Sequence, residues 1–107
     1  MDIQLKKGLL ETCLLAVLKK GDSYGYQIIR DISTCIEMTE STLYPILKRL
    51  EAAACLTTYS VEHNGRLRKY YRITDVGRAR IREFLEEWDD VMQVYYFIEE
   101  ADRYEAR

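Results

Sequence analysis

The stretch from Thr39 to Thr74 constrains the fold most, because it joins a short amphipathic helix pattern to a cationic hairpin pattern. Thr39 is a favourable N-cap residue, and apolar residues recur every three or four positions in the segment that follows. Two strand-like runs, 57–63 and 66–73, flank Asn64-Gly65, the dipeptide most favoured in two-residue hairpin turns. A helix beside a cationic hairpin is typical of a winged helix, which places the helix in the major groove of DNA and the hairpin against phosphates.

The predicted helix after Thr39 has an apolar and a polar face. We expect the inward positions to be Leu43, Ile46 or Leu47, Leu50 and Ala54, and the outward positions to be Ser41, Tyr44, Pro45 and Lys48. Pro45 removes the backbone hydrogen bond to the Ser41 carbonyl. This predicts either a tolerated kink or a bend that seats the first helical turn on DNA.

Three further helices are predicted around this unit. Residues 4–19 have apolar positions on more than one face, which indicates burial on two sides. Gly21-Asp-Ser23 is expected to end this helix and cap the next, at 24–33, while Thr74-Asp75 is expected to cap a last helix that runs to about Tyr104. The expected fold class is mainly α with a small β-hairpin, a winged helix-turn-helix over 1–74 with a C-terminal dimerisation helix over 75–107.

The last helix carries an apolar stripe that one chain cannot cover. The stripe positions step by three and four residues, and they are Ile81, Phe84, Trp88, Val91, Tyr95 and Ile98. A helix of this length outreaches a small winged-helix core, and exposed side chains of this size would each forfeit about 1.5–3 kcal/mol of burial. We therefore expect a homodimer in which each last helix packs against the first and last helices of its partner, with Leu9 and Cys13 also in the interface.

Charge is distributed unevenly along the chain. The whole chain has a formal net charge of −2, but residues 39–72 carry +3 and residues 73–107 carry −5. This gradient predicts that the helix–hairpin unit faces a polyanion, with double-stranded DNA as the partner.

The composition excludes several other classes. Three widely spaced cysteines and a single histidine, His63, predict no metal site, no cofactor and no disulfide framework, and instead a reducing cytoplasm. We expect the cysteines to be small core residues. The longest apolar run, 13–18, is too short for a membrane span, and the chain lacks the nucleophile–base pairing and phosphate-binding glycine loop of common enzymes.

Four segments resemble the PadR family of bacterial winged-helix repressors, in its short form with a single C-terminal helix. The segments are Gly21–Ile29, Thr42-Leu-Tyr-Pro-Ile-Leu-Lys-Arg-Leu-Glu51, Gly65-Arg-Leu-Arg-Lys-Tyr-Tyr-Arg-Ile-Thr74 and Gly77. The resemblance implies DNA contacts from Ser41, Thr42, Tyr44 and Lys48 of the third helix, from Tyr24 and Tyr26 near phosphate, and from Arg66, Arg68 and Lys69 in the wing. The residues leave Arg49 open: it binds either a phosphate or a carboxylate such as Glu51.

The resemblance also implies an effector pocket at the dimer interface. Short members of the family pair a tryptophan at the position of Trp88 with its symmetry mate and hold flat, often cationic drugs between the two rings. The other positions that match this pocket are Leu5, Gly8, Thr12, Leu85 and Met92, and the last replaces a carboxylate of a relative. The alternative for Trp88 is a plain dimer-core aromatic.

Three hypotheses follow for the function. The first is a sequence-specific regulator, a repressor that binds a palindromic site as a homodimer and responds to an apolar or aromatic small molecule. The second keeps the DNA binding and makes a cysteine thiol the input. The third is a winged-helix module whose cationic face binds an acidic protein.

Overall fold

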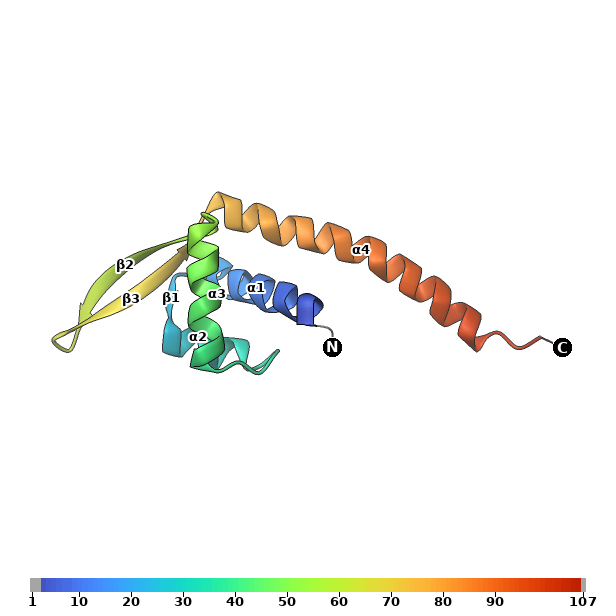
Figure 1. Ribbon diagram of the computed structural model, residues 1–107, viewed down its shortest axis with the longest axis horizontal. Helices are drawn as coiled ribbons and strands as arrows, with labels where there is room; N and C mark the ends of the chain where they lie inside the picture. Colours follow the sequence, from blue (N-terminus) through green and yellow to red (C-terminus); the bar gives the residue numbers. More distant parts are fainter. Residues whose placement is uncertain (1–2, 107) are drawn as a thin grey trace.

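The computed structural model describes residues 3–106, which form four helices and a three-stranded antiparallel sheet (Figure 1). In chain order the elements are α1 (Ile3–Lys19), β1 (Ser23–Tyr24), α2 (Gly25–Ile32), α3 (Glu40–Ala52), β2 (Leu56–His63), β3 (Arg66–Ile73) and α4 (Asp75–Arg103). The predicted mainly α fold with a small β-hairpin is therefore confirmed. Residues 1, 2 and 107 of the predicted segments 1–74 and 75–107 lie outside the described residues.

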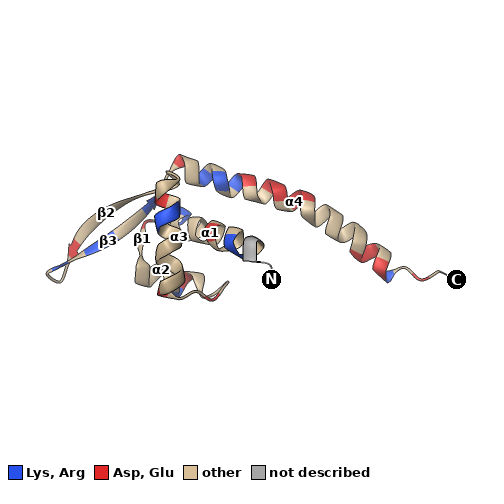
Figure 2. Ribbon diagram, in the orientation of Figure 1, with Lys and Arg blue, Asp and Glu red and all other residues tan. Residues whose placement is uncertain are grey.

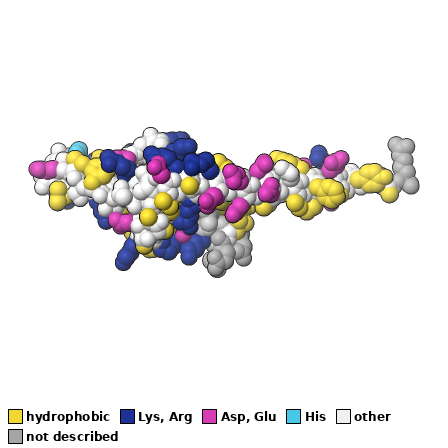
Figure 3. Space-filling view, turned by 90° about the horizontal axis from the view of Figure 1, so that it is seen from above, with side chains coloured by type: hydrophobic (Ala, Val, Ile, Leu, Met, Phe, Trp, Pro, Cys, Tyr) yellow, Lys and Arg dark blue, Asp and Glu magenta, His cyan; other side chains and the backbone are white. Residues whose placement is uncertain are grey.

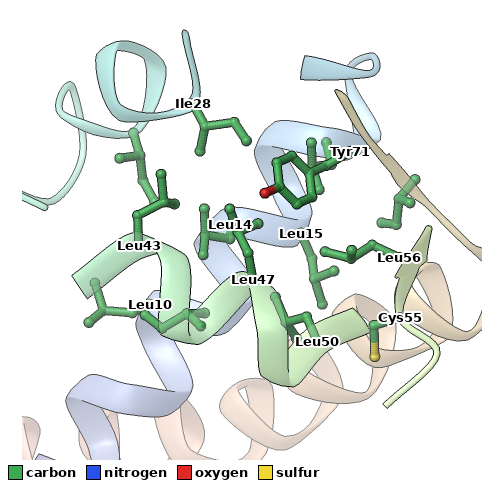
Figure 4. Packing of buried hydrophobic residues seen from close by; sticks show 14 of the residues in the cluster. Leu10, Leu14, Leu15, Ile28, Leu43, Leu47, Leu50, Cys55, Leu56 and Tyr71 are labelled. Atoms are coloured by element: carbon green, nitrogen blue, oxygen red, sulfur yellow. The ribbon is translucent and has the colours of Figure 1, made fainter. Parts of the chain in front are cut away.

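The core lies where α1, α2, α3 and the base of the sheet meet (Figure 4). Leu14 and Leu15 of α1 are both fully buried although they are adjacent in sequence. Adjacent helical positions lie about 100° apart, so burial of both requires a wide apolar face, and α2, β3 and α4 all contact α1. Ile28 of α2 and Leu43 of α3 are also fully buried in this cluster.

The sheet has the order β1-β3-β2. The predicted hairpin is confirmed: Asn64 and Gly65 form its turn with φ of 51° and 78°, the positive values that a tight primed turn requires. The strand β1, whose Ser23 and Tyr24 pair with Tyr71 and Tyr70, was not predicted from the sequence. A two-residue strand is too short to show a periodic sequence pattern. It forms because β3 supplies its hydrogen-bonding partners.

The start of α2 corrects a second prediction. The N-cap residue is Tyr24, without a side-chain cap, and Ser23 is instead a buried strand residue whose hydroxyl has no hydrogen-bond partner. The helix ends at Ile32, one residue before the predicted end.

In α3, Thr39 is the N-cap residue as predicted, but its hydroxyl pairs with the Ser41 hydroxyl at 2.9 Å and makes no cap hydrogen bond to the backbone. The inward prediction was wrong for Ala54, which is exposed and has a φ of 61°. The chain turns there through the left-handed region to enter β2, so that Cys55 and not Ala54 enters the core.

The helix α4 starts and ends close to its predicted bounds. The Thr74 side chain caps it by accepting a hydrogen bond from the Gly77 N–H at 3.2 Å. Ile81 is buried in the core of its own chain, which corrects its assignment to a dimer interface. The distal part of α4 extends away from the other elements (Figure 1), and the described molecule measures 73 × 25 × 22 Å. None of the described helices combines the length and the apolar character that crossing a bilayer requires.

Candidate nucleic-acid interface

The polar face of α3 is exposed as the sequence predicted. Leu43, Ile46, Leu47 and Leu50 are buried, and the side chains between them point to solvent. Ser41, Thr42, Tyr44 and Lys48 are therefore available together on one helix surface. Figure 2 shows lysine and arginine on this helix, on the hairpin and at the start of α4, and acidic residues along the rest of α4.

Tyr44 extends from α3 toward the first residue of α2. The Cα of Gly25 packs against this ring, and a Cβ atom there would overlap the Tyr44 hydroxyl and lie 3.1 Å from its Cζ. Glycine at position 25 thus leaves the room that the Tyr44 side chain occupies. The ring is still 47% exposed, so it contacts the protein on one side and solvent on the other.

A surface cavity of about 340 Å³ lies where α2, α3 and β3 meet. Its lining includes six residues from the predicted interface or its supports: Tyr24, Gly25, Tyr26, Tyr44, Arg68 and Lys69. The structure thus brings Tyr44 of α3 together with the predicted contacts of α2 and the wing, whereas Ser41 and Thr42 line a separate hollow beside Lys6 and Lys7 of α1. Arg66 lies farther out at the hairpin tip with His63, and both are exposed.

The wing (β2, β3 and their turn) is stiffened by stacked aromatic rings. Tyr59 and Tyr70 stack with centroids 5.5 Å apart, and Tyr24 meets Tyr70 edge-on at the same distance. The guanidinium of Arg68 lies 4.0 Å above the Tyr24 ring, a favourable cation–π distance. The Arg68 guanidinium of the wing is therefore held against Tyr24, the residue that immediately precedes α2.

Asp22 ties the other end of this aromatic stack to the turn after α1. Its carboxylate accepts hydrogen bonds from the Tyr59 hydroxyl at 2.7 Å and from Arg72 Nε at 3.0 Å. The hydrogen bond from Tyr59, and then Arg72, lowers the pKa of Asp22, while Asp22 raises the pKa of Tyr59. Both groups consequently keep their neutral-pH charge states. Asp22, Tyr59 and Arg72 were not predicted as site residues, because no local pattern links residues this far apart in the sequence.

Arg49 is engaged by a carboxylate. Its Nη2 lies 3.4 Å from Glu11 Oε1 on α1, so the structure realises the carboxylate alternative, with Glu11 as the partner and not Glu51. Glu51 instead accepts a hydrogen bond from Thr58 at 3.3 Å.

The predicted effector residues are only partly assembled within one chain. Gly8 and Thr12 line a cavity of about 220 Å³ between α1 and α4, together with Glu11, Arg80, Glu83, Phe84 and Glu87. Trp88 and Met92 are half-buried just beyond it, whereas Leu85 and Leu5 are 60% and 39% exposed.

The cysteines differ in environment. Cys55 is buried and Cys13 is half-buried against the core, but Cys35 is exposed, so the core prediction was wrong for Cys35. Cys35 lies in the segment between α2 and α3, in which Ile36 and Met38 pack on the core instead.

Comparison with known proteins identifies relatives across most of the chain. The model of the transcriptional regulator PadR-like family matches residues 14–83. The crystal structure of smu.1704 from Streptococcus mutans UA159 is 42% identical in sequence, with 94% of each chain covered and a TM-score of 0.78. A PadR-like transcription factor from Bacteroides fragilis is 33% identical, with 89% of this chain and 94% of that one covered and a TM-score of 0.79. Bacillus subtilis PadR, solved in complex with operator DNA, is 26% identical, with 72% of this chain and 46% of that one covered and a TM-score of 0.68.

Proposed function

Because the chain belongs to the PadR-like family of transcriptional regulators, we propose that it is a ligand-responsive repressor that binds a palindromic operator as a homodimer. The observation that carries the DNA contact is the hollow at which Tyr44 of α3, the start of α2 and the cationic wing meet. An α-helix fits the major groove, and arginines on an adjacent hairpin reach phosphates. The operator complex of the related PadR from Bacillus subtilis supports DNA as the partner.

Within this interface we assign two kinds of contact. Ser41, Thr42, Tyr44 and Lys48 of α3 face base edges, and Arg66, Arg68 and Lys69 of the wing face phosphates, with Tyr24 and Tyr26 beside them. Base contacts set the sequence preference, while phosphate contacts set affinity and its dependence on salt. Arg49 is left to its partner Glu11.

The proposed dimer rests on apolar surface that the single chain leaves uncovered. Val91, Tyr95 and Ile98 are 49%, 50% and 59% exposed on the same helix face as Trp88, and Figure 3 shows hydrophobic side chains along the distal part of α4. The helix has 29 residues, which corresponds to about 43 Å at 1.5 Å per residue. We place Phe84, Trp88, Val91, Tyr95 and Ile98 in the interface, with Leu9 and Cys13 of the partner's α1 against them.

The uncovered apolar surface of the distal helix is wider than this stripe. Val94 is 59% exposed and lies one helical turn from both Val91 and Ile98, and Phe97 is 75% exposed and lies one turn from Val94. So wide an apolar surface favours a helix that packs between two partner elements, α1 and α4. Pairing of α4 alone would cover only part of it.

The effector site is placed where the dimer would close the α1–α4 cavity. Gly8 and Thr12 line this cavity. We place Trp88, Met92 and Leu85 of α4 and Leu5 of α1 on the side that the partner would cover. A molecule bound between subunits would shift the distance between the two α3 helices and thereby change operator affinity.

The experiment that tests this function is selection of duplexes from a random DNA library, followed by titration of a selected duplex. We expect a palindromic sequence, weaker binding by the Lys48→Ala and Arg68→Ala variants, and a reduced salt slope where a phosphate contact is lost. Arg78→Ala is the matched control, because Arg78 pairs with Asp75 on the surface of α4. Selection of no sequence at low salt would exclude the proposal.

A further inference from the structure

Glu11, in the middle of α1, binds one arginine from α3 and one from α4. Its Oε1 accepts hydrogen bonds from Nε and Nη2 of Arg49, both at 3.4 Å, and its Oε2 accepts one from Nη2 of Arg80 at 2.9 Å. Only 13% of the Glu11 side chain is exposed, against 43% for Arg49 and 42% for Arg80. One mostly buried carboxylate therefore links three helices.

Arg80 reinforces the link from the side of α4. Its Nη1 lies 3.5 Å from the sulfur of Cys55, a fully buried residue just past the end of α3. The same guanidinium thus contacts α1 through Glu11 and the segment that follows α3 through Cys55. A slide or rotation of α4 on α1 would move both contacts.

The three helices have different roles in the proposed function: α3 reads DNA, α4 pairs the subunits, and α1 lies between them. We propose that Glu11 is the positioning residue that fixes α3 relative to α4, and with it the spacing and angle between the two α3 helices of a dimer. This inference rests on the proposed function, since only a dimer has a spacing to fix. The α1–α4 cavity is lined by Glu11 and Arg80, so a ligand there would contact the link itself.

The link is separable from the stability of the fold. Leu14 and Leu15 bury α1 against the core independently of Glu11. If the carboxylate is removed, Arg49 and Arg80 can turn toward water, because both are already more than two-fifths exposed. Loss of the charge should therefore loosen the angle between helices without unfolding the chain.

Half-site spacing gives a readout that a merely structural role would not move. A duplex selected by the wild-type protein is compared with the same duplex carrying one inserted base pair at its centre, which separates and rotates the half-sites. We expect the insertion to weaken wild-type binding by about tenfold or more, the scale of an ordinary coupling free energy. For Glu11→Gln and for Arg80→Gln we expect a loss of about threefold or less.

Controls separate this inference from the proposed function. In Arg78→Gln the inserted base pair should weaken binding as much as in the wild type, because Arg78 pairs only with Asp75 in the described residues. In Glu11→Asp, which keeps the carboxylate, the insertion should weaken binding more than in Glu11→Gln. Thermal unfolding checks that each variant is folded. If Glu11→Gln does not fold, Arg80→Gln still tests the link. Variants that weaken binding to both duplexes equally would overturn the inference. A wild-type protein that selects no duplex, or binds as a single chain, would instead overturn the proposed function.

Discussion

The Cα of Gly25, the first residue of α2, packs against the hydroxyl end of Tyr44 on α3. The two helices of the helix-turn-helix contact each other here, and the absence of a side chain at Gly25 leaves room for the Tyr44 ring. The absence of a side chain at position 25 thus affects the position of Tyr44, a residue that we propose to contact DNA.

Gly25→Ala should impair DNA binding with little effect on folding. The added methyl group overlaps a Tyr44 ring that is 47% exposed and free to swing outward, so we expect the free energy of unfolding to change by less than about 1 kcal/mol. Affinity for a selected duplex should fall by about 1–3 kcal/mol, the usual value of one base contact. In a Tyr44→Ala background the same change should have no further effect on affinity, and a full additional loss there would contradict the account.

Gly77→Ala should do the opposite, lowering stability directly. A Cβ atom at position 77 would overlap the Cys55 carbonyl oxygen and lie 2.7 Å from Cγ1 of Ile73, and backbone cannot swing aside. The Cys55 carbonyl also accepts the Thr74 N–H hydrogen bond at 3.0 Å. We expect a loss of about 1–3 kcal/mol in urea denaturation, typical of overpacking. A midpoint equal to that of Gly25→Ala would contradict this packing argument.

Local patterns predicted the hairpin, the exposed face of α3 and the extent of α4, because turn chemistry, helical period and capping are encoded in neighbouring residues. They could not predict β1, which exists because Tyr70 and Tyr71 supply its partners. They also placed Ile81 in a dimer stripe, since period alone does not distinguish the part of a helix that packs on its own chain from the part that extends beyond it.

The supports of the candidate site were beyond sequence reasoning for the same reason. Glu11 meets Arg49 and Arg80 only after three helices have packed, and Asp22 meets Arg72 across a separation of 50 residues. Charged residues at such separations give no periodic signal. Residues that we propose to face DNA could be named from the sequence, but the residues that support them could not.

Asp22→Asn should reduce the loss of unfolding free energy that occurs when the pH is lowered. The hydrogen bond from Tyr59 and the charge of Arg72 place the folded pKa of Asp22 below the unfolded value of about 4. A depressed folded pKa contributes stability above the unfolded pKa, and this contribution is lost as the pH falls through the folded pKa. The stability gap between wild type and Asp22→Asn should thus be present near neutral pH and shrink below about pH 4. Urea denaturation at several pH values measures it, and a gap that stays constant would contradict the assignment.

Alkylation should distinguish the cysteines and test the thiol-input hypothesis. Cys35 is exposed and should react first, whereas burial and the neighbouring Cys35 raise the pKa of Cys13 and slow its reaction. Cys55 is buried and should react only on unfolding. Mass spectrometry follows the order of labelling. We expect DNA affinity to survive modification of Cys35, and its loss would favour the thiol-responsive alternative.

The pairing of two chains through α4 is the claim on which the operator symmetry, the effector site and the role of Glu11 all depend. Sedimentation velocity at micromolar concentration, with and without a selected duplex, tests it most directly. We predict a species of twice the 12.7 kDa chain mass in free solution and two chains on each duplex. A stable 12.7 kDa species that saturates the duplex as one chain would contradict the account.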